Sequence, residues 1–262
     1  MAYFAGVDIG SLTCDVAVLD GGGGLVAHEV VLTGARSRVA VERALSGALD
    51  RLGIAREGLA SMVATGYGRE RVDGRSASLT EITCHARGAH HLFPGTQLVI
   101  DVGGQDCKAI RVDDYGRVAD FAMNDKCAAG TGRFFEVMAR ALEIDLDELG
   151  PLALRATKPV ALSSVCTVFA ESEVVGLVAG DEAPENIAAG LCRAAAEKVR
   201  ALVHRVGLAS EVTVTGGGAL NVGFRAAVEE LLGCTLNVPA QPQLVGALGA
   251  ALLGREACNG HG

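Results

Sequence analysis

The fold of this 262-residue chain is decided by two similar stretches, Val7-Asp8-Ile9-Gly10-Ser11 and Ile100-Asp101-Val102-Gly103-Gly104. In each stretch an apolar run ends in Asp, an aliphatic residue and Gly, and a second apolar run then starts at a cysteine. A glycine turn between two strands exposes backbone N–H groups that can bind phosphate. Each Asp can hold hydrated Mg²⁺, which prefers carboxylate and water ligands beside phosphate oxygens. The two copies therefore predict two hairpins that hold a nucleotide polyphosphate from both sides.

Either copy alone is also typical of an ordinary tight β-hairpin, and it is the matched duplication that favours phosphate binding. We predict catalytic roles for Asp8, Asp101 and Gln105, with the two aspartates organising metal and water. The nucleotide contacts predicted from the two hairpins are Gly10, Ser11, Leu12, Thr13, Cys14, Asp15, Gly103, Gly104 and Lys108.

The composition indicates an aliphatic core and narrows the classes of partner. Half of the residues are apolar, but aromatic residues make up only 4% and Trp is absent. The net charge of −8 argues against nucleic acid or an anionic membrane as a partner surface. Neither a secretory signal nor an apolar run of about 20 residues is visible. We therefore expect a cytoplasmic protein with reduced thiols, whose eight cysteines need another explanation than disulfides.

Strand and helix patterns alternate along the chain in two similar halves. Strands are expected at 3–9, 14–19, 25–32, 59–65, within 98–112, and at 117–123, 211–215 and 235–238. Helices are expected at 37–52, 79–92, 132–144, 166–180, 184–207, 221–232 and 243–253. Meandering strands followed by a helix, a strand and a helix predict two related α/β lobes around a cleft. We place the lobes at 1–95 and 96–242, with a last helix within 243–262 that packs back on the first lobe.

A third nucleotide element is expected after the strand Val212–Thr215, where Gly216, Gly217 and Gly218 precede a helix. Glycines let a flat base or ribose approach the backbone closely, although a generic strand-to-helix turn has the same composition. Together with the two hairpins, this turn resembles the ATPase fold of actin, Hsp70 and sugar kinases. The resemblance implies that Gly216–Gly218 and Gln243 lie near adenosine.

The middle of the chain carries a more specific resemblance. Its residues are Met123-Asn124-Asp125-Lys126-Cys127-Ala128-Ala129-Gly130-Thr131-Gly132-Arg133-Phe134 and Ser163-Ser164-Val165-Cys166-Thr167-Val168-Phe169-Ala170-Glu171-Ser172-Glu173-Val174. Supporting stretches lie at 64–69, 102–106 and 246–251. These sequences resemble the activators of 2-hydroxyacyl-CoA dehydratases, and the ATPase subunits of benzoyl-CoA reductase belong to the same group.

The resemblance implies a homodimeric ATPase with ATP or ADP, Mg²⁺ and one [4Fe–4S] cluster shared by two chains. In that family, reduced ferredoxin or flavodoxin supplies an electron that reaches a dehydratase, where it creates a ketyl radical. Cys127 and Cys166 are the expected cluster ligands, because two chains would then supply the usual four thiolates. Opening and closing of the lobes would change the angle between the two Cys-bearing helices.

Other interpretations of the roles of the cysteines stay open. Cys127 and Cys166 could be small buried residues, and we expect the other cysteines of the chain to be ordinary core or surface residues. Cys84 with His85, His90 and His91 has the composition of a zinc site, but a predicted helix carries all four without a second ligand group.

One position departs from the family pattern. The family commonly carries Lys where this chain has Asp15, four residues after the first Gly-Ser. An anion beside phosphates should weaken nucleotide binding unless Lys108 or Mg²⁺ compensates.

Three other functions are compatible with the same fold. They are an ATPase subunit of benzoyl-CoA reductase or a related reductase, a small-molecule kinase, and an actin-like protein that uses ATP as an assembly switch.

Overall fold

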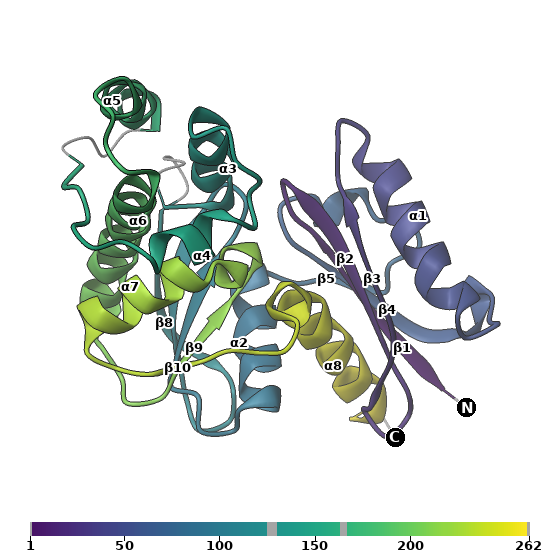
Figure 1. Ribbon diagram of the computed structural model, residues 1–262. Coiled ribbons are helices and arrows are strands. Elements are labelled where there is room, and N and C mark those ends of the chain that lie inside the picture. The colour runs from purple at the N-terminus through teal and green to yellow at the C-terminus, as the bar shows by residue number, and fades with distance from the viewer. Residues whose placement is uncertain (1, 125–129, 163–166, 261–262) are drawn as a thin grey trace.

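The computed structural model describes residues 2–124, 130–162 and 167–260, which form two five-stranded mixed sheets with helices around them (Figure 1). The first sheet has the strand order β3-β2-β1-β4-β5 and the second β10-β9-β6-β7-β8. In both, an antiparallel three-stranded meander is extended by two parallel strands beside its first strand. The two sheets therefore have the same topology, as the sequence predicts from the duplicated hairpin.

The first sheet is formed by the N-terminal third of the chain. Its strands are β1 (Tyr3–Ile9), β2 (Thr13–Leu19), β3 (Leu25–Leu32), β4 (Leu59–Thr65) and β5 (Ala77–Ser78). Helix α1 (Ser37–Asp50) packs its alanines and leucines against β1 and β2 on one face. Helix α8 (Val245–Asn259) covers the other face with Ala247, Leu248, Ala251 and Leu252.

The second sheet and the helices around it contain more residues than the first sheet and its helices. Its strands are β6 (Leu98–Val102), β7 (Cys107–Val112), β8 (Val118–Asn124), β9 (Val212–Thr215) and β10 (Leu236–Asn237). Its helices are α3 (Gly132–Ala141), α4 (Leu149–Ala153), α5 (Thr167–Ala179), α6 (Pro184–Val206) and α7 (Val222–Leu232). Phe135 of α3 and Phe224 of α7 meet edge to face in its core, with ring centroids 5.6 Å apart. This core is therefore packed from aliphatic side chains and a few phenylalanines, without a tryptophan.

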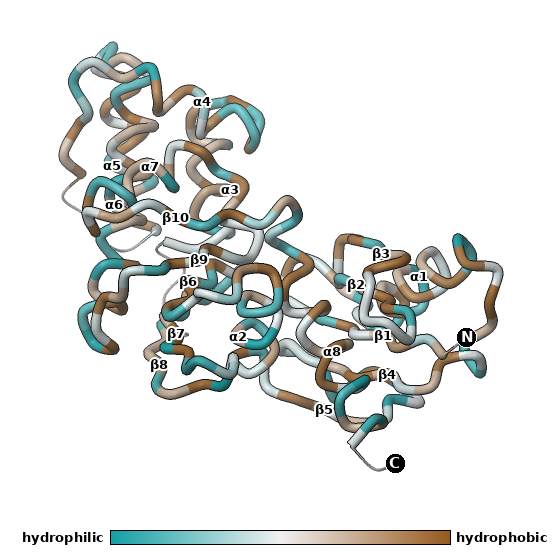
Figure 2. The backbone as a smooth tube through the Cα atoms, turned by 90° about the horizontal axis from the view of Figure 1, so that it is seen from below, coloured by the Kyte–Doolittle hydropathy of each residue, from teal (hydrophilic) through white to brown (hydrophobic). Residues whose placement is uncertain are grey.

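Helix α2 (Glu81–Leu92) lies beside α8 between the two sheets, as both views show (Figures 1 and 2). The two helices approach closely because each has a glycine at the contact. A Cβ atom on Gly88 would lie 2.2 Å from the Val245 carbonyl oxygen, and one on Gly249 would lie 1.8 Å from that of Cys84. The opposite face of α2 packs on the second sheet through Ala86 and Ala89. The helix pair therefore fixes one sheet against the other.

The expected elements are confirmed with a few differences. Helix α8 begins at Val245 and ends at Asn259, because Pro242–Leu244 form a separate 3-10 turn. The short α4 and the two-residue β5 were not expected, since each is too brief to show a hydrophobic period. The lobe boundaries stay a prediction, and α2, which they assign to the first lobe, contacts both sheets. No helix in the described ranges has an apolar stretch that could span a bilayer.

Candidate nucleotide-binding site

A cavity of about 870 Å³ lies between the two sheets, at the ends of β1 and β6 where the two predicted phosphate hairpins turn. The structure brings most of the predicted residues together around it. The first hairpin contributes Asp8, Gly10, Ser11, Leu12, Thr13 and Asp15, and the second contributes Asp101, Gly103, Gly104, Gln105 and Lys108. Gly216, Gly217, Gly218 and Gln243 line the same cavity.

Cys14 does not line the cavity. Neighbouring residues of a strand point to opposite faces, so the Cys14 side chain lies in the core of the first sheet while Thr13 and Asp15 face the cavity. Burial raises the pKa of its thiol to about 12. This cysteine is therefore a core residue rather than a side-chain contact of a nucleotide.

The two hairpin turns have the same hydrogen bond and lie against each other. The Gly10 amide donates to the Thr13 carbonyl at 2.9 Å, and the Gly103 amide donates to the Asp106 carbonyl at 2.9 Å. A Cβ atom on Gly104 would lie 2.6 Å from Ser11 Oγ and from Leu12 Cγ. Only glycine allows the turns to approach this closely, so one side of the cavity is closed by direct contact between the hairpins.

His85 of α2 lies between the two aspartates, and sequence reasoning missed it. Its Nε2 is 3.7 Å from Asp8 Oδ2, and its Nδ1 is 3.5 Å from Asp101 Oδ1. Nδ1 also lies 3.0 Å from Thr215 Oγ1, which itself donates to Asp101 Oδ1 at 3.1 Å. Although burial lowers it, the Asp101 and Asp8 carboxylates raise the pKa of His85 to about 9. A charged imidazolium therefore connects the two hairpins at neutral pH.

Lys108 is buried on the floor of the cavity with three acidic partners. Its Nζ lies 2.7 Å from Asp106 Oδ1, 3.2 Å from Asp101 Oδ2 and 3.4 Å from Glu81 Oε1. Despite burial, these carboxylates raise the pKa of Lys108 well above its usual range. Burial works against ionisation of Asp101, but His85 and Lys108 hold its pKa below the usual range. The positive charge of Lys108 is thus already engaged by the second hairpin and by α2.

Asp15 lies directly opposite Asp8 in the pairing of β1 with β2. Its Oδ2 accepts a hydrogen bond from Thr13 Oγ1 at 3.1 Å, and its buried Oδ1 has no partner among the described residues. Burial, followed by the charge of Asp8, raises the pKa of Asp15 to about 8. The first hairpin therefore presents two neighbouring carboxyl groups to the cavity.

The glycine turn forms the end of the cavity next to α8. Gly216 has a φ of 81°, and its amide donates to the Pro242 carbonyl at 2.9 Å. A Cβ atom on Gly216 would lie 2.4 Å from the Val102 carbonyl oxygen, and one on Gly217 would lie 3.7 Å from Gln243 Nε2. Gln243 and the glycines thus share one wall, as expected for residues that contact an adenosine.

Six of the eight cysteines lie in the part of the chain that the structure describes. Cys127 and Cys166 lie outside the described residues, so their assignment as cluster ligands stays a prediction. Cys84 and Cys192 are core residues, and burial raises the pKa of both thiols to about 12. The described part of the chain has no group of three or more His, Cys, Asp or Glu side chains arranged to hold a metal ion. The zinc interpretation of residues 84–91 therefore has no support in the described part.

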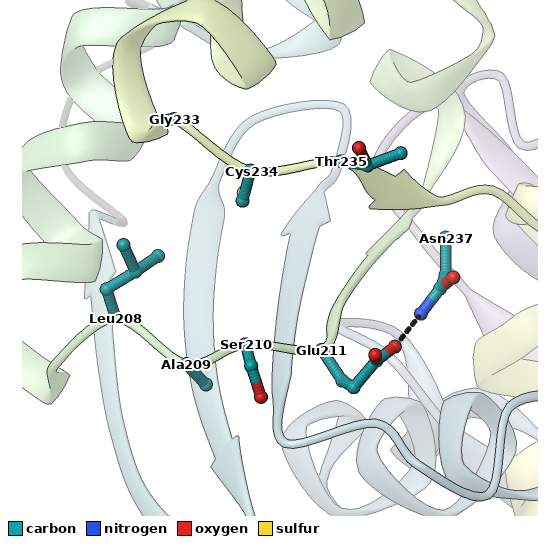
Figure 3. Close-up of a pocket in the computed structure, with 8 residues that line it drawn as sticks. All are labelled: Leu208, Ala209, Ser210, Glu211, Gly233, Cys234, Thr235 and Asn237. Carbon is teal, nitrogen blue, oxygen red and sulfur yellow. Dashed lines mark hydrogen bonds between the residues drawn. The ribbon is translucent and has the colours of Figure 1, made fainter.

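A second cavity, of about 640 Å³, lies at the opposite end of β9 (Figure 3). It is lined by Leu208–Glu211 and by residues 233–235, and Asn237 Nδ2 donates to Glu211 Oε2 at 3.1 Å. None of the residues predicted for nucleotide binding lines it. The cavity between the sheets is therefore the candidate nucleotide site.

Comparisons with known proteins agree with this geometry. The model of the BadF/BadG/BcrA/BcrD ATPase family matches residues 5–254. The activator of lactoyl-CoA dehydratase from Anaerotignum propionicum is 45% identical over 255 residues, which cover 97% of this chain and 98% of that protein. One subunit of benzoyl-CoA reductase from Thauera aromatica is 37% identical over 180 residues, 66% of this chain and 64% of that subunit.

Solved structures give the same assignment. Component A of (R)-2-hydroxyglutaryl-CoA dehydratase from Acidaminococcus fermentans superposes with a TM-score of 0.95 at 41% identity, covering 99% of this chain and 100% of that one. The activator of 2-hydroxyisocaproyl-CoA dehydratase from Clostridium difficile, solved with ADPNP, has a TM-score of 0.95 at 40% identity and covers 99% and 96%. A ROK glucokinase from Streptomyces griseus, with a TM-score of 0.59 at 15% identity over 97% and 100%, shares the fold alone.

These likenesses confirm the predicted actin- and sugar-kinase-like ATPase fold with two related lobes around a nucleotide cleft. The family match covers nearly the whole chain, including both hairpins and the glycine turn. The protein belongs to the BadF/BadG/BcrA/BcrD ATPase family.

Proposed function

We propose that this protein hydrolyses ATP in order to pass one electron to a 2-hydroxyacyl-CoA dehydratase and so activate it. The observation that carries the proposal is the pairing of Asp8 and Asp101, one from each hairpin, across one cavity and around one charged histidine. Two proteins of 45% and 40% identity that are named as activators of dehydratases support the choice of partner.

The cavity fits a magnesium nucleotide. The carboxylates of Asp8 and Asp101 are the hard oxygen donors that Mg²⁺ prefers, and they leave room for its water ligands. The amides of the two facing turns would hold the phosphates, while Gly216–Gly218 and Gln243 would hold adenosine. Gln105, which is exposed in the second turn and lines the cavity, would orient the attacking water. Asp101, with its lowered pKa, stays ionised for that reaction.

The second hairpin is also connected to the segment that contains Cys127. The Gly132 amide donates to the Gly103 carbonyl and the Arg133 amide to the Gly104 carbonyl, both at 2.9 Å. The buried thiol of Cys107 donates to the Gly130 carbonyl at 2.8 Å. A phosphate that moves the Gly103–Gly104 turn would therefore move the start of α3. We infer that nucleotide exchange reaches residues 125–129 along this path.

A second copy of the chain is the proposed partner for the cluster. Helix α5, which follows Cys166, exposes Val168, Phe169, Val175 and Val178 by 45–67%. Apolar side chains gathered in this way are typical of a covered surface. In a two-fold dimer over α5, Cys127 and Cys166 of the two chains would together supply four thiolate ligands. When bound there, a [4Fe–4S] cluster would supply a single low-potential electron, replenished by ferredoxin or flavodoxin.

Anaerobic purification followed by iron and sulfide analysis tests the proposal. We expect about four iron and four sulfide ions per two chains, and loss of both in Cys127→Ala. Cys258→Ala is the matched control, because Cys258 is exposed on α8 and should leave the iron content unchanged. Iron-free wild-type protein, or a full cluster in Cys127→Ala, would contradict the proposal.

Three outcomes would instead support other functions. Phosphoryl transfer to a sugar by colourless protein would indicate a small-molecule kinase, and light scattering on ATP addition would indicate an actin-like switch. Activation of a benzoyl-CoA reductase rather than a dehydratase would place the protein with the ATPase subunits of that enzyme.

A further inference from the structure

The cavity between the sheets is strongly acidic for a site that receives a polyphosphate. Lys108 and His85 are its basic side chains within the described ranges, and both are already engaged by carboxylates. The acidic side chains that line it are Asp8, Asp15, Glu81, Asp101, Asp106, Glu136, Asp145 and Asp147. Phosphate oxygens brought among these carboxylates are repelled at short range unless cations lie between them. The charge balance therefore calls for more positive charge than the described lining provides.

The crowding of acidic groups is closest at one pair of residues. Asp8 and Asp15 are cross-strand partners, so their side chains point to the same face of the sheet and into the same cavity. They are only 7% and 5% exposed. Like charges directly opposite each other destabilise a strand pair, and burial increases that cost. Such a pair is relieved either by a proton on one carboxyl group or by a cation that takes the place of that proton.

One of the four oxygen atoms of Asp8 and Asp15, Oδ1 of Asp15, is buried without a hydrogen-bond partner among the described residues. Asp8 faces His85 through Oδ2, and Asp15 accepts from Thr13 through Oδ2. Oδ1 of Asp15 is buried and has no hydrogen-bond donor among the described residues. Neither Lys108 nor any Arg in those ranges forms an ion pair with Asp15. An unpartnered oxygen on a carboxyl group that lines the phosphate cavity is a candidate ligand for a metal ion.

We propose that Asp8 and Asp15 together bind a divalent cation, Mg²⁺ in the cell, in addition to the Mg²⁺ that ATP carries into the site. Carboxylates and waters are the ligands that this ion prefers, and a phosphate oxygen can complete its shell. The cation neutralises the aspartate pair and connects the first hairpin to the polyphosphate. The role in nucleotide binding rests on the proposed function, whereas binding of the cation to the pair does not.

Mn²⁺ serves as the probe in place of Mg²⁺, because it is paramagnetic. The protein is titrated with Mn²⁺, and electron paramagnetic resonance measures the Mn²⁺ that stays free. Without nucleotide, we expect the wild type to bind one Mn²⁺ more per chain than Asp15→Asn. With saturating ADP, the wild type should again bind one Mn²⁺ more than the variant. Asp114→Asn, an exposed residue of the β7–β8 turn, removes the same charge far from the cavity and should match the wild type.

Asp15→Lys provides the complementary test, because its ammonium group supplies the missing charge covalently. This variant should bind ADP while holding one Mn²⁺ fewer than the wild type. Equal Mn²⁺ counts in wild type and Asp15→Asn, with or without ADP, would overturn the inference. Calorimetry with ADP tests the nucleotide site separately. If the wild type does not bind ADP, the proposed function is contradicted, whatever the Mn²⁺ count.

Discussion

His85 Nε2 lies 3.7 Å from Asp8 Oδ2, and this contact joins helix α2 to the first phosphate hairpin. The other ring nitrogen faces Asp101 of the second hairpin. One imidazole therefore contacts both carboxylates that are proposed to organise Mg²⁺ and water. Because α2 lies against α8 between the sheets, the position of this ring depends on how closely the two helices pack.

The first prediction concerns the pH dependence of stability through His85. Its pKa is raised from 6.5 to about 9 in the folded state, so its stabilising contribution is complete below pH 6.5 and is lost as pH rises through about 9. Relative to His85→Gln, the wild type should lose about 2–4 kcal/mol of unfolding free energy between pH 6 and pH 10. Urea unfolding at several pH values, in the presence of EDTA, measures this difference. A gap between the two proteins that does not change with pH would contradict a charged His85.

The second prediction concerns Asp15 in metal-free protein. Its pKa is raised from 3.8 to about 8, so the folded state holds a proton that the unfolded state releases. Stability should therefore fall as pH rises from about 4 to about 8, and Asp15→Asn should remove this loss. At pH 8.5 in EDTA we expect Asp15→Asn to melt several degrees above the wild type. A wild type that is the more stable of the two under these conditions would be the opposite result.

The third prediction concerns the close contact of α2 with α8. Gly249→Ala would place a methyl group against the Cys84 carbonyl, and backbone has little freedom to move there. We expect a loss of about 3 kcal/mol or more in unfolding free energy. Gly47→Ala in α1 is the control, because its Cβ atom would meet only the flexible end of Glu29, and its effect should stay within about 1 kcal/mol. Equal losses of unfolding free energy in Gly249→Ala and Gly47→Ala would show that the close glycine contact does not contribute to stability.

The fourth prediction concerns the contact between the two hairpin turns. In Gly104→Ala the added methyl group would press on Ser11 and Leu12 and hold the turns apart. We expect at least about a tenfold loss in ADP affinity, equivalent to 1.4 kcal/mol, measured by calorimetry. The melting temperature without nucleotide should change little, because the turns lie at the edge of the cavity. Unchanged ADP affinity would mean that the hairpins need not meet when nucleotide binds.

Local patterns were sufficient to predict the hairpins and the glycine turn. The Asp8 and Asp101 stretches each contain their own strand, turn and strand, so the periodicity of a few residues determines their structure. Strand alternation also explains why Cys14 differs from Thr13 and Asp15, and it could have excluded this residue beforehand.

The role of His85 could not be predicted in this way. It depends on a helix that packs between two sheets formed by distant parts of the chain, and the nearby cysteine and histidines pointed to zinc instead. The partners of Lys108 likewise come from β6, the second turn and α2. Such long-range contacts leave no periodic pattern in a single sequence.

The most direct test of the account is the ATP-dependent activation of a purified 2-hydroxyacyl-CoA dehydratase under strictly anaerobic conditions. With this protein, reduced ferredoxin and ATP, we predict that dehydration begins and that one electron per active dehydratase suffices to start it. ADPNP in place of ATP should give no activation, because the bond between its last two phosphates resists hydrolysis. Equal dehydration with and without ATP, or none with all components present, would contradict the proposed function.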